Sequence, residues 1–146
     1  MKIRTLLLSL ICVTASVPVA VNAAEKEDQT VLGSHMEKMS GAFRKLRKSV
    51  VDASQNAESL KLVATMKTEA AASLKEEPAK KAEIPAADQA KFVADYQKGM
   101  KDMAAKIDAL EAALKANKND DAAKIVEEMA AAQKQGHKAF KKQDKK

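Results

Sequence analysis

Apolar residues recur at spacings of three and four over most of the chain after residue 28, a pattern that predicts amphipathic helices. The clearest run spans 28–54 and forms an unbroken heptad stripe. Its apolar positions are Leu32, Met36, Met39, Phe43, Leu46 and Val50. A less regular stripe over 57–75 contains Leu60, Val63, Met66, Ala70 and Leu74. Both segments are predicted to be helices with one buried face.

Two more helices are predicted in the second half of the chain. One begins after Pro85, since proline suits the first turn of a helix, and reaches about Asn117. Its apolar positions are Val93, Tyr96, Met100, Met103, Ile107, Leu110 and Leu114. The other spans 121–142, and Asn119 or Asp120 is predicted to cap it. Its inward face is predicted to hold Ile125, Val126, Met129, Ala132, Gly136 or His137, and Phe140.

The segments between these helices are two short polar turns and one longer connection, residues 76–85, which contains Pro78 and Pro85. Short turns place consecutive helices side by side and antiparallel. The fold predicted is therefore all-α, an antiparallel up-down-up-down four-helix bundle. Composition agrees, because the chain has only 4 Gly and 3 Pro and shows no alternating strand pattern.

The first 23 residues have the features of a secretory signal. Lys2 and Arg4 precede an apolar run, and small residues at 21–23 offer a cleavage site. We therefore expect export to the periplasm and a mature chain of residues 24–146 that forms one domain. A retained N-terminal anchor is the alternative.

Charge and cysteine content narrow the function classes. Cys12 is the only cysteine and lies in the predicted signal, so the mature chain has no disulfide and no Cys-x-x-Cys-His site for covalent haem. The chain carries a formal charge of +6, and loss of Lys2 and Arg4 leaves +4. Because aromatic residues are only 3% and the charge is spread along all helices, no nucleic-acid partner is expected.

Met36 and His137 are the most informative pair of residues. Met36 lies near the start of the first predicted helix and His137 near the end of the last. In an up-down-up-down bundle these ends are neighbours, so a thioether faces an imidazole, and Met/His ligation of haem iron is an electron-transfer arrangement. Separately, each residue has a simpler interpretation: His137 as a hydrogen-bonded structural histidine, and Met36 as core.

The residues next to this pair are expected to play other parts. His35 points roughly 100° away from Met36 around the helix and is predicted to lie at the surface or its boundary. Met39, one turn deeper, is predicted to pack rather than ligate. No di-iron carboxylate set, nucleotide loop, nucleophile elbow or zinc spacing is found, so the protein is not expected to be an enzyme.

The predicted mature chain resembles the soluble cytochrome b562 family over nearly its whole length. The resemblance is carried by Met36-Glu37-Lys38-Met39, Tyr96-x-x-Gly99-Met100, Ile107-Asp108-Ala109-Leu110 and His137-Lys138-Ala139-Phe140. It implies one non-covalent haem b per chain, with Met36 and His137 as axial iron ligands. The haem-lining positions it implies are Leu32, Met39, Tyr96 and Met100.

The chain departs from the family pattern at three places near the site. Gln133 stands where related sequences have Arg, Gly136 replaces a bulky residue, and Met100 replaces phenylalanine-like bulk. These differences concern the packing and the propionate side of the haem.

The function expected is that of a periplasmic, monomeric one-electron carrier with periplasmic or membrane-bound redox partners. The alternatives are a non-haem periplasmic binding or stress protein that uses methionine for copper, and a ligand-free relative. Lysines crowd the end of the last helix, and they either form a solvated face or steer an acidic redox partner. They are Lys134, Lys138, Lys141, Lys142, Lys145 and Lys146.

Overall fold

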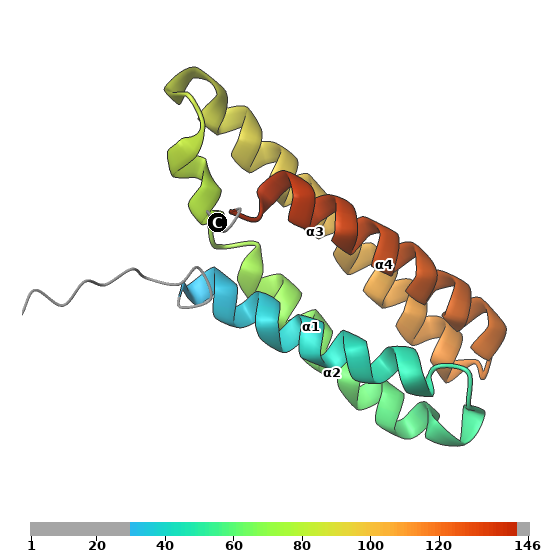
Figure 1. Ribbon diagram of the computed structural model, residues 1–146. Helices are drawn as coiled ribbons and strands as arrows, with labels where there is room; N and C mark the ends of the chain where they lie inside the picture. The colour runs from blue at the N-terminus through green and yellow to red at the C-terminus, as the bar shows by residue number, and fades with distance from the viewer. Residues whose placement is uncertain (1–29, 143–146) are drawn as a thin grey trace, which may run out of the picture.

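The computed structural model describes residues 30–142, so the predicted signal, 1–23, lies outside the described residues. Within that range the chain forms four α-helices and no strand: α1 (Val31–Ser49), α2 (Asn56–Ser73), α3 (Ala86–Lys115) and α4 (Asn119–Phe140). They run up, down, up and down (Figure 1). The prediction of an all-α antiparallel four-helix bundle is confirmed.

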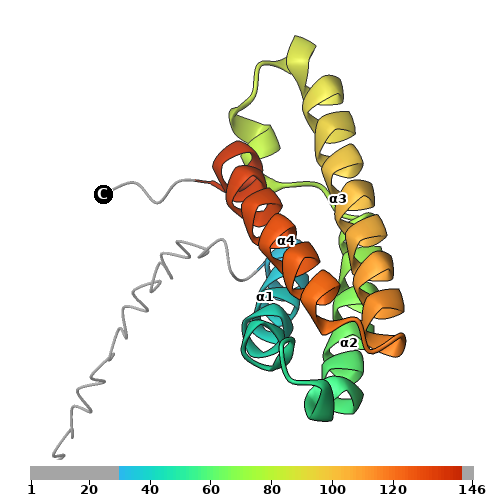
Figure 2. The same cartoon turned by 90° about the vertical axis from the view of Figure 1, so that its right-hand side faces the viewer.

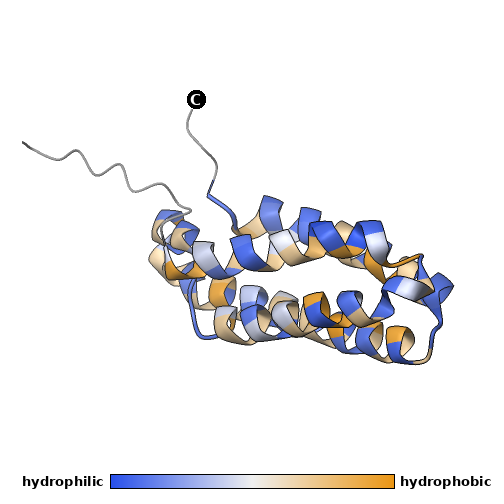
Figure 3. Ribbon diagram, turned by 90° about the horizontal axis from the view of Figure 1, so that it is seen from below, coloured by the Kyte–Doolittle hydropathy of each residue, from blue (hydrophilic) through white to orange (hydrophobic). Residues whose placement is uncertain are grey.

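The helices pack in two layers, α1 with α2 and α3 with α4, and α2 also packs on α3 (Figures 1 and 2). The backbones of α1 and α4 stay further apart than those of the other neighbouring helices. Apolar residues lie on the sides of the helices that face one another, and polar residues lie outside (Figure 3). In the described residues no helix is both long and apolar enough to cross a bilayer.

The heptad stripe of the first segment produces α1 and its buried face. Thr30 caps the helix, because its Oγ1 accepts a hydrogen bond from the Gly33 amide at 2.9 Å. The lower part of the stripe is buried, whereas Leu32 and Met36 are only partly covered. The helix is shorter at both ends than the 28–54 predicted. The buried residues of the stripe are Met39, Phe43, Leu46 and Val50.

Asparagine side chains join the helices at the end of the bundle where α1 finishes. Asn56 Nδ2 donates to the Leu114 carbonyl at 3.3 Å, and Asn119 Nδ2 donates to the Val50 carbonyl at 2.7 Å and to Asn56 Oδ1 at 2.8 Å. The prediction that Asn119 or Asp120 caps α4 is wrong. Lys118 occupies the N-cap without a side-chain hydrogen bond, because Asn119 bonds α1 and α2 instead.

The opposite end of the bundle is closed by the long connection, which contains the short 3-10 helix η3 (Ala79–Glu83). Lys80 Nζ donates to the carbonyl of Ala139 at 2.7 Å and to that of Lys138 at 3.4 Å. Lys80 therefore satisfies carbonyls that the last turn of a helix leaves without an intrahelical partner. Figures 1 and 2 show this segment beside the end of α4.

Aromatic contacts hold the same end of α4 against α3. The Phe140 ring meets Phe92 edge to face at 5.3 Å between centroids, and Tyr96 at 5.6 Å. Phe140 packs against the buried core although it is only partly covered. Together with Lys80, these rings fix the position of the turn that carries His137.

Candidate cofactor site

A cavity of about 700 Å³ lies at the η3 end of the bundle, between α1, α3, α4 and the connection. Its volume is within the range of about 300–1,000 Å³ that small-molecule and cofactor sites occupy. No residue of α2 lines the cavity. The cavity lies where the backbones of α1 and α4 are widely spaced. Its main apolar lining residues are Leu32, Met36, Met39, Met100, Met103 and Phe140.

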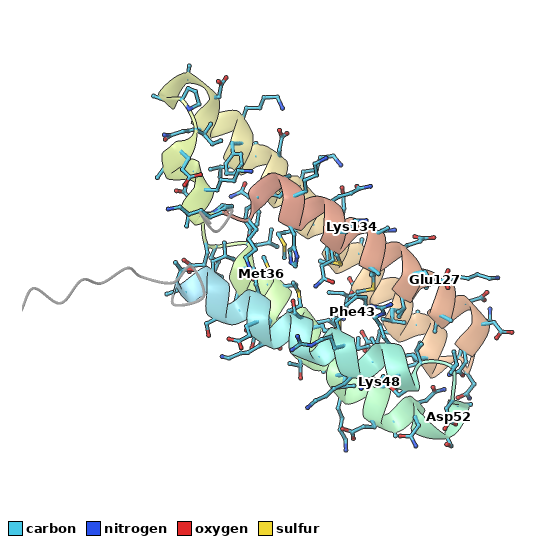
Figure 4. The ribbon with its side chains drawn as sticks, in the orientation of Figure 1. Met36, Phe43, Lys48, Asp52, Glu127 and Lys134 are labelled. Atoms are coloured by element: carbon cyan, nitrogen blue, oxygen red, sulfur yellow. The ribbon has the colours of Figure 1, made fainter. Side chains whose placement is uncertain are left out.

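Met36 and His137 line this cavity from two different helices. Met36 comes from α1, on the side that faces α4 (Figure 4), and His137 comes from the last turn of α4. The structure therefore brings together the thioether and the imidazole that lie about a hundred residues apart in sequence. Their role as iron ligands stays a prediction.

The two histidines of the described chain differ in their bonding. His35 Nδ1 lies 2.5 Å from Glu69 Oε2 on α2, and its side chain is 24% exposed, so it is a boundary residue held in a structural pair. No hydrogen bond or ion pair of the His137 ring is found within residues 30–142. His35 is therefore the hydrogen-bonded structural histidine. The ring nitrogens of His137, in contrast, have no hydrogen-bond partner among the described residues and lie at the cavity.

The four residues expected to contact a cofactor, Leu32, Met39, Tyr96 and Met100, all line the cavity. Tyr96 is 3% exposed, and its hydroxyl donates to the Ser73 carbonyl at 2.9 Å. Burial raises the pKa of the Tyr96 phenol well above its usual value of 10, and the negative charge of Glu76 adds to the effect. The phenol is therefore neutral at physiological pH and acts as a fixed hydrogen-bond donor.

Of the other residues at the cavity, sequence reasoning missed Pro78, Ala79 and Ser40, whereas it placed Gln133 and Gly136 near the site. Pro78 and Ala79 reach it from the connection, which has no helical periodicity to signal its position. Ser40 and Gln133 also line it, and Gln133 Nε2 donates to Ser40 Oγ at 3.1 Å. Gly136 also lines the cavity, and a Cβ built on it would meet no atom within 4 Å.

Four acidic or lysine side chains line the cavity, and two of them, Asp102 and Lys106, form ion pairs, whereas Glu37 and Lys141 form none within the described chain. Asp102 pairs with Lys98 at 2.7 Å, and Lys106 pairs with Glu128 at 2.5 Å. Lys141, next to the end of α4, lines the cavity and forms no ion pair within the described chain. A positive charge is therefore available beside His137.

This donor set suits a large apolar cofactor with an axially ligated iron. A thioether and an imidazole on two sides of an apolar cavity can occupy both axial positions of a haem iron. A bare metal ion held by protein groups would need more donors. No group of three or more His, Cys, Asp or Glu residues is placed to hold one in the described part of the chain.

Comparisons with known proteins agree with this geometry. No curated protein and no solved structure matches the chain. A family model described as Cytochrome b562 matches residues 31–141, which contain all four helices from α1 to α4. The chain therefore belongs to the cytochrome b562 family.

Proposed function

We propose that this protein is a periplasmic one-electron carrier that holds one non-covalent haem b in the cavity between α1, α3 and α4. Its family already makes it a haem-binding protein of the electron-carrier type. The single observation that carries the proposal is that Met36 and His137 line the same cavity from two different helices.

In this proposal the two side chains differ in how strongly they bind iron. His137 supplies the stronger ligand, and the contacts of Lys80 and Phe140 hold its turn of α4 in place. Met36 supplies the weaker thioether, which favours the reduced state and raises the potential. The haem, when bound, supplies a redox centre that accepts and gives up one electron. If Met36 and His137 both held the iron, they would leave it no open position for a substrate, which would suit electron transfer rather than catalysis.

The rest of the cavity keeps water away. Leu32, Met39, Met100 and Phe140 present apolar surface, and the neutral phenol of Tyr96 is engaged with the Ser73 carbonyl.

Location and partners are parts of the same proposal. The predicted signal at 1–23 supports export to the periplasm. The proposed partners are periplasmic or membrane-bound redox proteins with acidic surfaces, because Lys134, Lys138 and Lys141 lie exposed at the end of α4. We propose that the protein acts as a monomer.

Absorption spectra of the exported protein and of ligand variants test the proposal. The wild type is expected to show a low-spin haem spectrum. His137→Ala is expected to lose most of its haem affinity, and Met36→Ala to keep haem with a spectrum shifted toward high spin, because imidazole is the stronger ligand. His35→Ala is the matched control and should stay low-spin.

Two outcomes would contradict the proposed function. One is a wild type that takes up no haem when it is supplied in excess. The other is a low-spin spectrum that survives unchanged in both His137→Ala and Met36→Ala, which would assign the ligands to other residues. Copper uptake by the wild type without haem uptake would favour the binding-protein alternative.

A further inference from the structure

Ser40 and Gln133 form the floor of the cavity directly below the two proposed ligands. Ser40 follows Met36 by four residues on α1, and Gln133 precedes His137 by four residues on α4. Residues four apart share a helix face and are separated by about 6 Å along the axis. Because α1 and α4 are antiparallel, both steps lead toward the same end of the bundle. The pair therefore lies one turn below the ligands on both helices.

The Ser40–Gln133 contact is a polar link between the two helices at the cavity end of the bundle. Gln133 Nε2 donates to Ser40 Oγ at 3.1 Å, and both residues are partly buried. Among the residues that the structure describes, the other side-chain hydrogen bond between α1 and α4 lies at the far end of the bundle, where Asn119 Nδ2 donates to the carbonyl of Val50, the C-cap of α1. The backbones of the two helices also approach each other less closely than those of the other neighbouring helices. Near the proposed ligands, the Ser40–Gln133 bond is therefore the side-chain hydrogen bond that spans α1 and α4.

Gln133, like Met39 and Met103, lines two apolar spaces. Above it is the large cavity, and below it is a void of about 20 Å³ that five apolar side chains line. They are Met39, Phe43, Met66, Met103 and Met129. Most of these are flexible methionines, which adapt to several packings and do not specify one spacing of the helices. The directional hydrogen bond from Gln133 to Ser40, in contrast, favours one spacing of α1 and α4.

We infer that Ser40 and Gln133 are a positioning pair that sets how far Met36 reaches toward the iron. This inference rests on the proposed haem function. His137 is anchored through the end of α4, by Lys80 and Phe140, so a change in helix spacing acts mainly on the weaker thioether. The pair thereby holds the thioether bond, and with it the high potential that this bond favours.

The experiment compares Gln133→Leu and Ser40→Ala with their double variant, and with Ser40→Thr, which keeps the hydroxyl. Gln97→Leu is the matched control, because Gln97 is a partly buried helical glutamine outside the cavity lining. The readouts are the high-spin fraction of the oxidised protein, the reduction potential and haem affinity. Thermal unfolding without haem gives the coupling between the two residues by a double-mutant cycle.

Loss of either partner is expected to raise the high-spin fraction, lower the potential and weaken haem binding by roughly 2- to 10-fold, the range of one net hydrogen bond. The double variant should shift no further than either single variant. Ser40→Thr and Gln97→Leu should resemble the wild type. In a Met36→Ala background, Gln133→Leu should cause no further change in potential, because the residue through which it acts is gone.

Three results would overturn the inference. Unchanged spectra and potentials in Gln133→Leu and Ser40→Ala, or fully additive shifts, would show that the bond does not position Met36. An equal shift in the Met36→Ala background would show that Gln133 acts on the haem directly. A wild type without a low-spin spectrum would instead contradict the proposed function, so the two failures are distinguishable.

Discussion

At the residue scale, Tyr96 links the core of the bundle to the cofactor cavity. Its ring packs edge to face on Phe140, and its hydroxyl donates to the Ser73 carbonyl at the end of α2. That carbonyl also accepts from the Glu76 amide at 3.2 Å, so it keeps a partner when the phenol is removed. The phenol therefore contributes about one net hydrogen bond to the folded state.

Tyr96→Phe is expected to lower the free energy of unfolding at pH 7 by about 0.5–1.5 kcal/mol. Burial raises the pKa of Tyr96 in the folded state above that in the unfolded chain, so the neutral phenol stabilises the fold fully below about pH 10. This contribution is lost as the pH rises further. Urea unfolding of both proteins between pH 7 and pH 11 should show the difference shrinking above about pH 10. A difference that widens at high pH would contradict this assignment.

Gly136 and Gly41 are helical glycines in different surroundings. Gly136 lines the cavity and a Cβ on it would meet no atom within 4 Å, whereas Gly41 does not line the cavity and a Cβ on it would lie 4.0 Å from Arg44 Nη2. Alanine at either position is expected to stabilise the haem-free protein by about 0.5–1 kcal/mol, because glycine is a poor helix former.

Only Gly136→Ala is expected to weaken haem binding, since its methyl group takes space beside His137. Chemical unfolding of the haem-free variants and haem titration check the two halves of this prediction, with Gly41→Ala as the control. Equal haem affinities in both variants would place the haem away from Gly136.

Single residues also show how far the sequence could be interpreted. The heptad spacing correctly placed Met39, Phe43 and Leu46 in the core, because burial follows from the helical period. It could not pair His35 with Glu69, since a contact between helices depends on how each helix is rotated about its axis. For the same reason the Ser40–Gln133 bond was not predicted.

At the scale of elements, the four helices were predictable and the long connection was not. Each helix bears an apolar stripe, whereas residues 76–85 carry no period that would signal η3 or its contact with α4. The ends of α1 were also misplaced, because polar residues such as Asp52 suit a helix end and a turn equally well. In the structure Asp52 caps the 3-10 turn Ala53–Gln55 by accepting from the Ser54 amide.

Lys80→Met tests whether the connection holds the end of α4. The variant keeps the aliphatic stem and removes the donor to the Ala139 carbonyl, and with it a cation at a helix C-terminus. A loss of about 0.3–1 kcal/mol is expected, with faster amide hydrogen exchange at 137–141 and weaker haem binding. Lys81→Met is the control, because Lys81 pairs with Glu77 inside the connection and not with α4. The same exchange rates in both variants would show that Lys80 does not hold the helix end.

At the scale of the whole molecule, the sequence pattern led to the bundle but not to the cavity. An up-down-up-down topology places the ends of α1 and α4 together, which is why Met36 and His137 could be matched from sequence. The size of the cavity depends on the separation of α1 and α4 and on small side chains such as Gly136. Neither quantity follows from hydrophobic periodicity, because that periodicity specifies which face is buried and not how tightly two faces meet.

Charge is distributed unevenly over the folded molecule. Along α3 most lysines are paired with acids, including Lys91 with Asp95 and Lys98 with Asp102. At the end of α4, in contrast, Lys134, Lys138 and Lys141 are exposed and form no ion pair with other described residues (Figure 4 labels Lys134). These three lysines therefore place unpaired positive charge at the end of α4 that carries His137.

This surface is expected to speed encounter with anionic redox partners, since surface fields act mainly on association rates. Electron transfer from the reduced haem protein to ferricyanide and to an acidic redox protein should slow as salt rises. The double variant Lys138→Glu with Lys141→Glu should slow it by about tenfold at low salt, without moving the optical spectrum. Lys101→Glu is the control, because Lys101 is exposed on α3 and does not line the cavity. Stopped-flow rates that do not depend on salt, or that fall equally in Lys101→Glu, would show that these lysines form a solvated helix end and do not steer a partner.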